Sequence, residues 1–261
     1  MVFRGELIFL GLGLYSGHLT LEAVNELKRA DIVYLELYTG IYEDADYLEK
    51  LVGTEKIVRL SRKELEEENG DIIMESLKNG LRVVLASPGD PFIATSHQAL
   101  KIRAMREGFK VRVIHGLSIL SVAVSESGLF SYKFGKSATI VYPKDGIVYE
   151  YPYLVLEENI SRGLHTLFLL EIDVDQNMLM TANEAMEIML ELERARGKKI
   201  FTENTMLVVL ARAGTPNKLV RAGRVGELLK TDFGHPPHTI IVPGKLHFIE
   251  EEALRTIGDG V

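Results

Sequence analysis

A chain of 261 residues, 46% of them hydrophobic and 26% charged, is expected to fold as a soluble globular α/β protein of one or two domains. It contains no cysteine, which excludes disulfides, thiolate nucleophiles and cysteine-ligated metal centres. The seven histidines are scattered without HxxxH or HExxH pairing, so we expect no metal site, and the net charge of −7 argues against a general nucleic-acid binder.

The sequence shows no pattern typical of a membrane span or a signal peptide. No apolar run reaches about 18 residues, so no membrane span is expected. The first residues enter a strand pattern without the layout of a signal peptide. We therefore expect a cytoplasmic protein.

The first half of the chain alternates between strand and helix patterns. Strands are predicted at 7–11, 32–37, 56–60, 82–86 and 110–114. Helices are predicted at 20–29 with Thr20 as N-cap, at 44–51, within 61–80 with an acidic solvated face at 64–68, at 96–107 and at 119–127. This alternation predicts a mostly parallel sheet covered by helices on both faces.

The second half of the chain is more mixed, and antiparallel pairing is expected there. Polar residues, glycine and proline cluster after residue 130, which suggests a linker near 133–137 and two domains, 1–135 and 136–261. Strands are predicted at 139–142, 166–172, 206–211 and 219–223, a long helix at 181–196, and the segment "TIIVPG" with a terminal helix at the end.

The stretch "FLGLGLYSGHLTLEAV", residues 9–24, contains a glycine-rich strand-to-helix loop. Gly11 and Gly13 match the first part of the GxGxxG dinucleotide fingerprint, and Glu36 lies where the ribose-binding acid would be. The third glycine, Gly17, comes one residue too late, so the turn has a different shape. From this loop alone, a dinucleotide site and a purely structural loop both remain open.

Two further loops follow predicted strands. In "SPGDP", Pro88 and Pro91 flank Asp90, whose carboxylate either attracts a cationic ligand or caps a turn. In "VIHGLS", Gly116 allows close backbone approach and Ser118 can cap the next helix. Three loops of this type would line one rim of the sheet, where α/β proteins bind ligands.

Taken together, these loops resemble the tetrapyrrole-methylase-like superfamily of S-adenosylmethionine-dependent methyltransferases. The runs "ELYTG", "PGDPFIATSH", "VIHGLSILSV", "MTANEAMEIML" and "DFGHPPHTIIVPGKLH" are most similar to its diphthine synthase family, over essentially the whole chain. The resemblance implies two α/β domains, a parallel N-terminal and a mixed C-terminal sheet, a homodimer, and a methyl donor in an interdomain cleft. It also implies a protein substrate, translation elongation factor 2, methylated on the amino group of a modified histidine.

The resemblance carries the family's donor-binding positions onto this sequence residue by residue. They are Leu14, Asp90, Ile93, Ser118, Ile119, Leu170, Ala213 and His238. No metal is implied. Asp90, His97 and His115 are candidate proton acceptors, and none of them is assigned a catalytic role.

Three alternatives remain. The nearest is another methyltransferase of the superfamily, acting on a corrin precursor or on ribosomal RNA, although the acidic charge counts against RNA. The second is a nicotinamide-dependent dehydrogenase that uses the first loop and Glu36, and the third is a non-enzymatic nucleotide sensor. The number of methyl groups is left open, with the trimethylated amine favoured.

Overall fold

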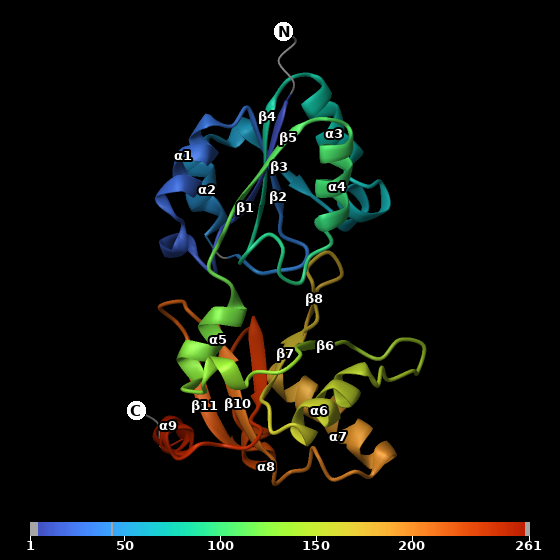
Figure 1. Ribbon diagram of the computed structural model, residues 1–261, viewed down its shortest axis with the longest axis vertical. Helices are drawn as coiled ribbons and strands as arrows, with labels where there is room; N and C mark the ends of the chain where they lie inside the picture. The colour runs from blue at the N-terminus through green and yellow to red at the C-terminus, as the bar shows by residue number, and fades with distance from the viewer. Residues whose placement is uncertain (1–4, 43, 259–261) are drawn as a thin grey trace. The chain divides into compact units, whose positions relative to one another are not determined.

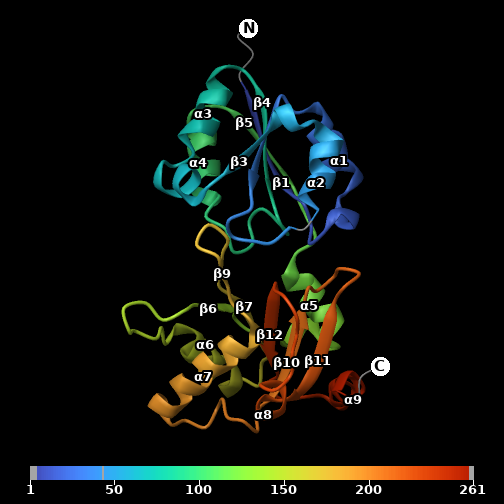
Figure 2. The ribbon, with the colours of Figure 1, turned by 180° about the vertical axis from the view of Figure 1, so that it is seen from behind.

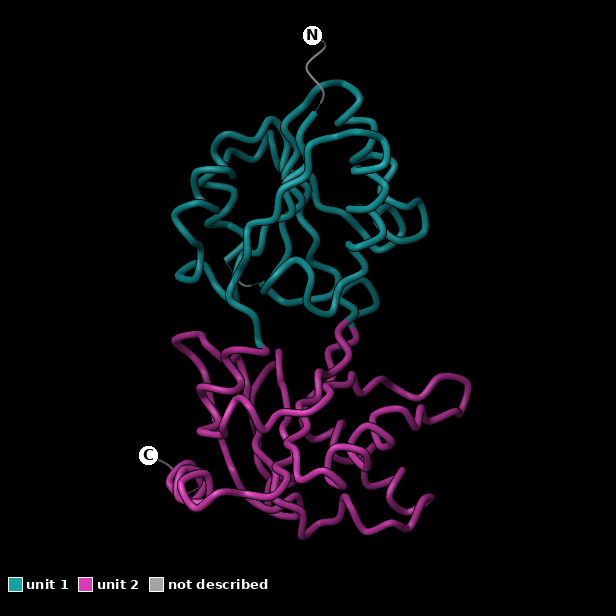
Figure 3. The backbone as a smooth tube through the Cα atoms, in the orientation of Figure 1, with its two compact units in different colours: residues 1–119, 173–177 teal, residues 120–172, 178–261 magenta. Residues whose placement is uncertain are grey.

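The computed structural model describes residues 5–42 and 44–258. The chain forms two compact units, which Figure 3 colours separately. Unit 1 comprises residues 1–119 with 173–177, and unit 2 comprises residues 120–172 with 178–261. Nearly all of helix α5 (Ile119–Ser127) therefore belongs to unit 2. The domain boundary proposed from the sequence at residue 135 stays a prediction.

Unit 1 is built on a sheet of five parallel strands. The strands are β1 (Glu6–Gly11), β2 (Ile32–Glu36), β3 (Ile57–Leu60), β4 (Arg82–Ser87) and β5 (Lys110–Ile114), in the spatial order β3-β2-β4-β1-β5. Apolar runs such as "LIFL" and "VVLA" form the central strands because both faces of this sheet are buried. The predicted parallel sheet is confirmed.

Helices cover both faces of this sheet, as the two opposite views in Figures 1 and 2 show. Helices α1 (Leu21–Arg29) and α2 (Ala45–Val52) lie on one side, and α3 (Asp71–Lys78) and α4 (Gln98–Arg106) on the other. Strand β1 serves both cores, because Ile8 packs in the cluster of Leu27 and Phe9 in that of Ile73. Thr20 caps α1, its hydroxyl oxygen accepting from the Ala23 amide at 3.0 Å, as predicted.

One helix expected within 61–80 is interrupted in the structure. A π-helical turn (Lys63–Glu67) is followed by left-handed residues Asn69 and Gly70, with φ of 51° and 69°, before α3 begins. An Asn-Gly pair adopts positive φ at little cost, so it separates the two segments. The acidic run is also only partly a solvated face: Glu67 and Glu68 are exposed, whereas Glu66 accepts from the Tyr38 and Ser96 hydroxyls.

Unit 2 contains a second, mixed sheet. Its strands are β6 (Ala138–Ile140), β7 (Thr166–Leu170), β10 (Met206–Ala211), β11 (Leu219–Arg224) and β12 (His238–Val242), in the order β11-β10-β12-β7-β6. Only the β6–β7 pair is parallel, and the other pairs are antiparallel as expected. Strands β8 (Ile172–Asp173) and β9 (Met178–Leu179) form a separate pair.

The helices of unit 2 are α6 (Tyr151–Ser161), α7 (Ala182–Arg196), α8 (Val225–Leu228) and α9 (Phe248–Gly258), in addition to α5. Thr181 and Glu184 form a capping box that starts α7 where the sequence predicts it. Tyr153 of α6 and Met186 of α7 pack with Phe168 of β7 in one buried core. None of the helices in the described part of the chain is long and apolar enough to cross a bilayer.

Candidate active site

Three loops of unit 1 meet at the carboxyl ends of the neighbouring strands β4, β1 and β5. The loop after β1 is hydrogen-bonded to the loop after β4 through Gly13 and Gly89, whose amides each donate to the other's carbonyl at 3.1 and 2.8 Å. The Leu12 amide donates to the Ser87 carbonyl at 2.9 Å. The prediction that these loops line one rim of the sheet is thus met by direct backbone contact.

The closest approach between the loops occurs at Gly11, Gly89 and Gly116. A Cβ atom on Gly116 would lie 2.0 Å from the Gly89 carbonyl oxygen and 2.7 Å from the Gly11 carbonyl carbon. A Cβ on Gly11 would lie 2.5 Å from the Gly116 nitrogen. At positions 11 and 116 only a residue without a side chain fits, which brings the loops after β4 and β5 together over the end of β1.

Asp90 is fixed at this rim by two hydrogen bonds. Its Oδ1 accepts from the Phe92 amide at 3.0 Å, and its Oδ2 lies 2.9 Å from Nδ1 of His115. The Asp90 side chain is 12% exposed and that of His115 is 79% exposed. The carboxylate therefore makes the turn contact foreseen for it and also holds a histidine of the third loop.

The other candidate donor-binding residues of unit 1 lie in the same loops. The Leu14 amide donates to Nδ1 of His18 at 3.3 Å, and the Ile93 amide donates to the Asp90 carbonyl at 3.2 Å. Ser118 is buried and precedes Ile119, the first residue of α5. The structure thus brings Leu14, Asp90, Ile93, Ser118 and Ile119 to one rim of the unit 1 sheet.

His97 is a buried residue that contacts the loop after β4. His97 is 2% exposed, and its Nδ1 lies 2.7 Å from the Pro91 carbonyl, to which it must donate. Burial lowers the pKa of His97, so it stays neutral at pH 7. Because its ring is buried and its Nδ1 proton is engaged, His97 positions the "GDPF" turn and is not available to a substrate.

Glu36 does not serve as the ribose-binding acid of a dinucleotide site. Its side chain is 1% exposed, and its Oε1 accepts from the amide and hydroxyl of Thr39 at 3.0 and 2.8 Å. Burial raises the pKa of this carboxyl. The strand order β3-β2-β4-β1-β5 also differs from the 3-2-1-4-5-6 order of the dinucleotide fold. Both observations count against the dehydrogenase alternative.

The remaining three candidate positions gather at one edge of the unit 2 sheet. His238 begins β12 opposite Ala211, the last residue of β10, and Ala213 follows two residues later. Thr239 pairs with Leu169 of β7, so Leu170 ends its strand at the same edge. All three side chains are nearly buried, with exposures of 6% for Leu170, 8% for Ala213 and 4% for His238.

His238 is a buried histidine whose two ring nitrogens differ in their hydrogen bonding. Its Nδ1 accepts from the Ala182 amide at 3.1 Å, so in the neutral ring the proton resides on Nε2. Nε2 is buried and makes no hydrogen bond of good geometry in the described part of the chain, although backbone carbonyls of His235 and Phe233 lie near the ring. Burial, together with the charge of Arg212, lowers the pKa of His238 to about 4. A buried N–H that lacks a well-formed hydrogen bond can donate to an acceptor atom of a ligand.

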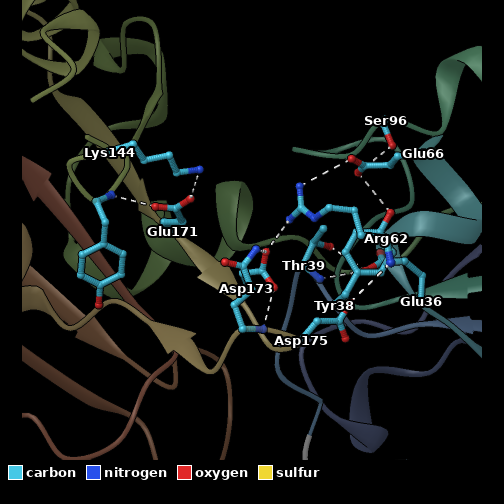
Figure 4. Close-up of polar contacts among 12 residues, drawn as sticks. Glu36, Tyr38, Thr39, Arg62, Glu66, Ser96, Lys144, Glu171, Asp173 and Asp175 are labelled. Atoms are coloured by element: carbon cyan, nitrogen blue, oxygen red, sulfur yellow. Dashed lines mark hydrogen bonds and ion pairs between the residues drawn. The ribbon is translucent and has the colours of Figure 1, made fainter. Parts of the chain in front are cut away.

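A set of polar contacts that the sequence did not indicate joins the tip of the β8–β9 segment to the rest of unit 1 (Figure 4). Arg62 lies 3.4 Å from Asp173 and 3.5 Å from Glu66, and the Val174 amide donates to the Tyr38 carbonyl at 3.1 Å. Within unit 2, Glu171 accepts from the Tyr142 amide at 2.7 Å and lies 3.6 Å from Lys144. The Arg62–Asp173 pairing spans more than a hundred residues, so no local pattern could have revealed it.

Unit 1 also has a cavity of about 470 Å³ beside α3 and α4. Its charged lining is largely paired within the protein, since Asp71 contacts Arg103 at 2.7 Å and Glu66 contacts Arg62. None of the eight donor-binding candidates lines this cavity. It adjoins the loop rim through His97, whose ring contacts the Pro91 carbonyl, but contains none of the proposed donor contacts.

Comparison with known proteins identifies the family to which this chain belongs. The model of the tetrapyrrole (corrin/porphyrin) methylases matches residues 6–229. The diphthine synthases of Methanocaldococcus jannaschii and Staphylothermus marinus are each 42% identical, the first over 98% of this chain and 100% of its own, the second over 96% and 93%. A crystal structure of diphthine synthase superposes with a TM-score of 0.87 at 35% identity, covering 97% of this chain and 96% of its own. The chain belongs to the diphthine synthases of the tetrapyrrole methylase family and is a methyltransferase.

Proposed function

We propose that the protein transfers methyl groups from S-adenosylmethionine to the amino group of the 2-(3-amino-3-carboxypropyl)histidine of translation elongation factor 2, forming diphthine. The observation that carries the proposal is the 42% identity to a diphthine synthase over 98% of the chain. The loop rim on unit 1 supports it, because family resemblance places donor contacts on these same loops. The identity of the methyl acceptor is inferred from the relatives, which are diphthine synthases.

The residues assigned to the donor fit a ligand of this kind in two respects. The close packing at Gly11, Gly89 and Gly116 holds three loops together at the carboxyl ends of β4, β1 and β5, the side of a parallel sheet on which α/β proteins bind ligands. In unit 2, Nε2 of His238 is a buried donor without a hydrogen bond of good geometry among the described residues. We propose that Leu14, Asp90, Ile93, Ser118, Ile119, Leu170, Ala213 and His238 contact the donor.

When bound, the donor would supply a methyl group on a sulfonium sulfur, and an in-line attack of the amine on the methyl carbon would release the sulfur as a thioether. The protein then has to bind the amine in its neutral form, align it with the methyl carbon and exclude competing water. Positioning of this sort supplies much of the acceleration in bimolecular reactions, up to about 7–11 kcal/mol of the barrier. We propose that no metal ion takes part and that the fixed "GDPF" turn provides part of this alignment.

The decisive experiment uses donor carrying a labelled methyl group. The protein is incubated with elongation factor 2 that bears the aminocarboxypropyl histidine, and with the same factor lacking the modification. We expect label only in the modified factor, and mass spectrometry to show a trimethylated amine. Labelling of a corrin precursor or of ribosomal RNA, but not of the factor, would favour the neighbouring methyltransferase activity instead.

Assembly and cellular location form the remainder of the proposal. We propose a homodimer that works in the cytoplasm, where elongation factor 2 is found, with no direct contact to nucleic acid or membrane. The net charge of −7 is consistent with the absence of a nucleic-acid surface. Light scattering coupled to size-exclusion chromatography tests the dimer, and a mass near the 29.2 kDa of one chain would contradict it.

A further inference from the structure

We propose that His115 is the general base that removes the proton from the substrate amine, and that Asp90 is the positioning residue that orients it. This inference rests on the proposed function, because the substrate amine is the group that must lose a proton. The geometry is an Asp–His pair at the ligand-binding rim: Oδ2 of Asp90 lies 2.9 Å from Nδ1 of His115. Sequence alone left three candidate acceptors, and the structure separates them.

The tautomer of His115 follows from its partner. A carboxylate only accepts hydrogen bonds, so Nδ1 of His115 carries the proton and donates it to Asp90. In the neutral ring this leaves the lone pair on Nε2. The side chain is 79% exposed and the described contacts place no partner on Nε2, so a substrate can reach it. Asp90 is the charged group in contact with this ring.

The other two candidates are already occupied. His97 is buried, and its Nδ1 donates to the Pro91 carbonyl. The Asp90 carboxylate accepts from the Phe92 amide through Oδ1 and from His115 through Oδ2. His115 is thus the candidate that combines an open nitrogen with an orienting carboxylate, the arrangement that activates histidine bases in many enzymes.

The proton balance of the reaction requires the base to act before each methyl transfer. At neutral pH the substrate amine is an ammonium, which has no lone pair for attack. Nε2 of His115 takes one N–H proton, and the bonding pair stays on the amine nitrogen. That pair then forms the new N–C bond as the C–S bond of the donor breaks toward sulfur. The imidazolium of His115, hydrogen-bonded to Asp90, then releases its proton to solvent. Each methylation that leaves an N–H on the product ammonium is followed by the same deprotonation before the next.

The first test is His115→Gln in single-turnover methyl transfer across pH 6 to 10. At pH 7 we expect a rate about 10²-fold below wild type, a typical contribution of a general base. Donor affinity by calorimetric titration should stay within about twofold, since Asp90 keeps its bond to the Phe92 amide. The deficit should shrink as the pH approaches the pKa of the amine, because more of the amine then arrives neutral.

The exposed His247 on unit 2 provides a matched control, and His247→Gln should transfer methyl groups at the wild-type rate. The deeper truncation His115→Ala should regain rate in proportion to added imidazole. A deficit of His115→Gln that is equal at every pH, or a wild-type rate at pH 7, overturns the role of His115. If the wild-type protein itself fails to label the factor, the proposed function is refuted, and the role of His115 as base is refuted with it.

The second test, Asp90→Asn, has a readout other than activity. Oδ1 at this position accepts from the Phe92 amide, so the asparagine must place its oxygen there and its NH₂ group toward His115. That NH₂ donates to Nδ1 and forces the ring proton onto Nε2. Nitrogen NMR of His115 should therefore show Nδ1–H in the wild type and Nε2–H in the variant, with the rate at saturating donor falling at least about 10²-fold. An unchanged tautomer would contradict the orienting role of Asp90.

Discussion

Replacing Gly116 by alanine tests whether the glycine junction holds the active-site loops in place. The added Cβ would lie 2.0 Å from the Gly89 carbonyl oxygen and 2.7 Å from the Gly11 carbonyl carbon. Both contacts are with backbone atoms, so no side chain can rotate away. Since Cβ contacts below 3.0 Å essentially never occur, the loops after β4 and β5 must separate by about 1 Å.

The magnitude follows from that displacement. Overpacking of this kind costs about 1–3 kcal/mol of folding free energy. Asp90 directly follows Gly89 and His115 directly precedes Gly116, so a shift of about 1 Å also moves these two residues. Misplacements of that size cost about 10²-fold in rate. We therefore expect Gly116→Ala to lose about 2 kcal/mol of stability and about 10²-fold in kcat/KM.

Urea unfolding measures the stability, and methyl transfer to the modified factor measures the rate. Gly223→Ala is the matched control, because its Cβ would come no closer than 3.4 Å to a flexible Leu228 side chain. Gly89→Ala separates crowding from backbone strain: no atom lies within 4 Å of its Cβ, but φ is +69°, which should cost about 1 kcal/mol. Wild-type stability and rate in Gly116→Ala, or equal losses in Gly223→Ala, would refute the reasoning.

Three further outcomes are expected. Asp90→Ala should raise the donor Kd several-fold in calorimetric titration, without lowering the free energy of unfolding by more than about 1 kcal/mol, and an unchanged Kd would remove Asp90 from the donor site. His238→Asn keeps an oxygen for the Ala182 amide but loses Nε2, so donor affinity should fall about 2- to 12-fold. Because the pKa of His238 is about 4, its contribution to donor affinity should not vary between pH 6 and 8. In Glu250, burial alone would raise the pKa, but hydrogen bonds from Lys133 and from the Phe130 and His247 amides lower it to about 2. This lowered pKa stabilises the fold by about 3 kcal/mol above pH 5, and the contribution is lost as the pH falls from about 4.5 to 2. Glu250→Gln should therefore lower the free energy of unfolding at pH 7 and lower it much less at pH 2.5. The control Glu252→Gln, at an exposed position, should not show this difference.

The strands of unit 1 were predictable because strands of a parallel sheet that is buried on both faces consist of continuous apolar runs. Strand β5 and helix α5 agree with the predicted ranges residue for residue. Helix α6 was missed because its apolar residues are not segregated on one stripe: Tyr153, Val155 and Leu156 are all buried by tertiary packing around it. The helix predicted within 61–80 is longer than the one in the structure because the amphipathic spacing continues across the left-handed residues Asn69 and Gly70.

The candidate site was predictable as a set of loops but not as a set of contacts. Each of the loops could be recognised locally, yet the strand order β4-β1-β5 that makes them neighbours depends on long-range pairing. Asp90 and His115 follow strands that are not adjacent, since β1 lies between β4 and β5. They reach each other because Gly11, at the end of β1, has no side chain to keep the flanking loops apart. The glycine that looked like part of a nucleotide fingerprint therefore has a different physical use: it allows a carboxylate and a histidine from two separate strands to form one pair.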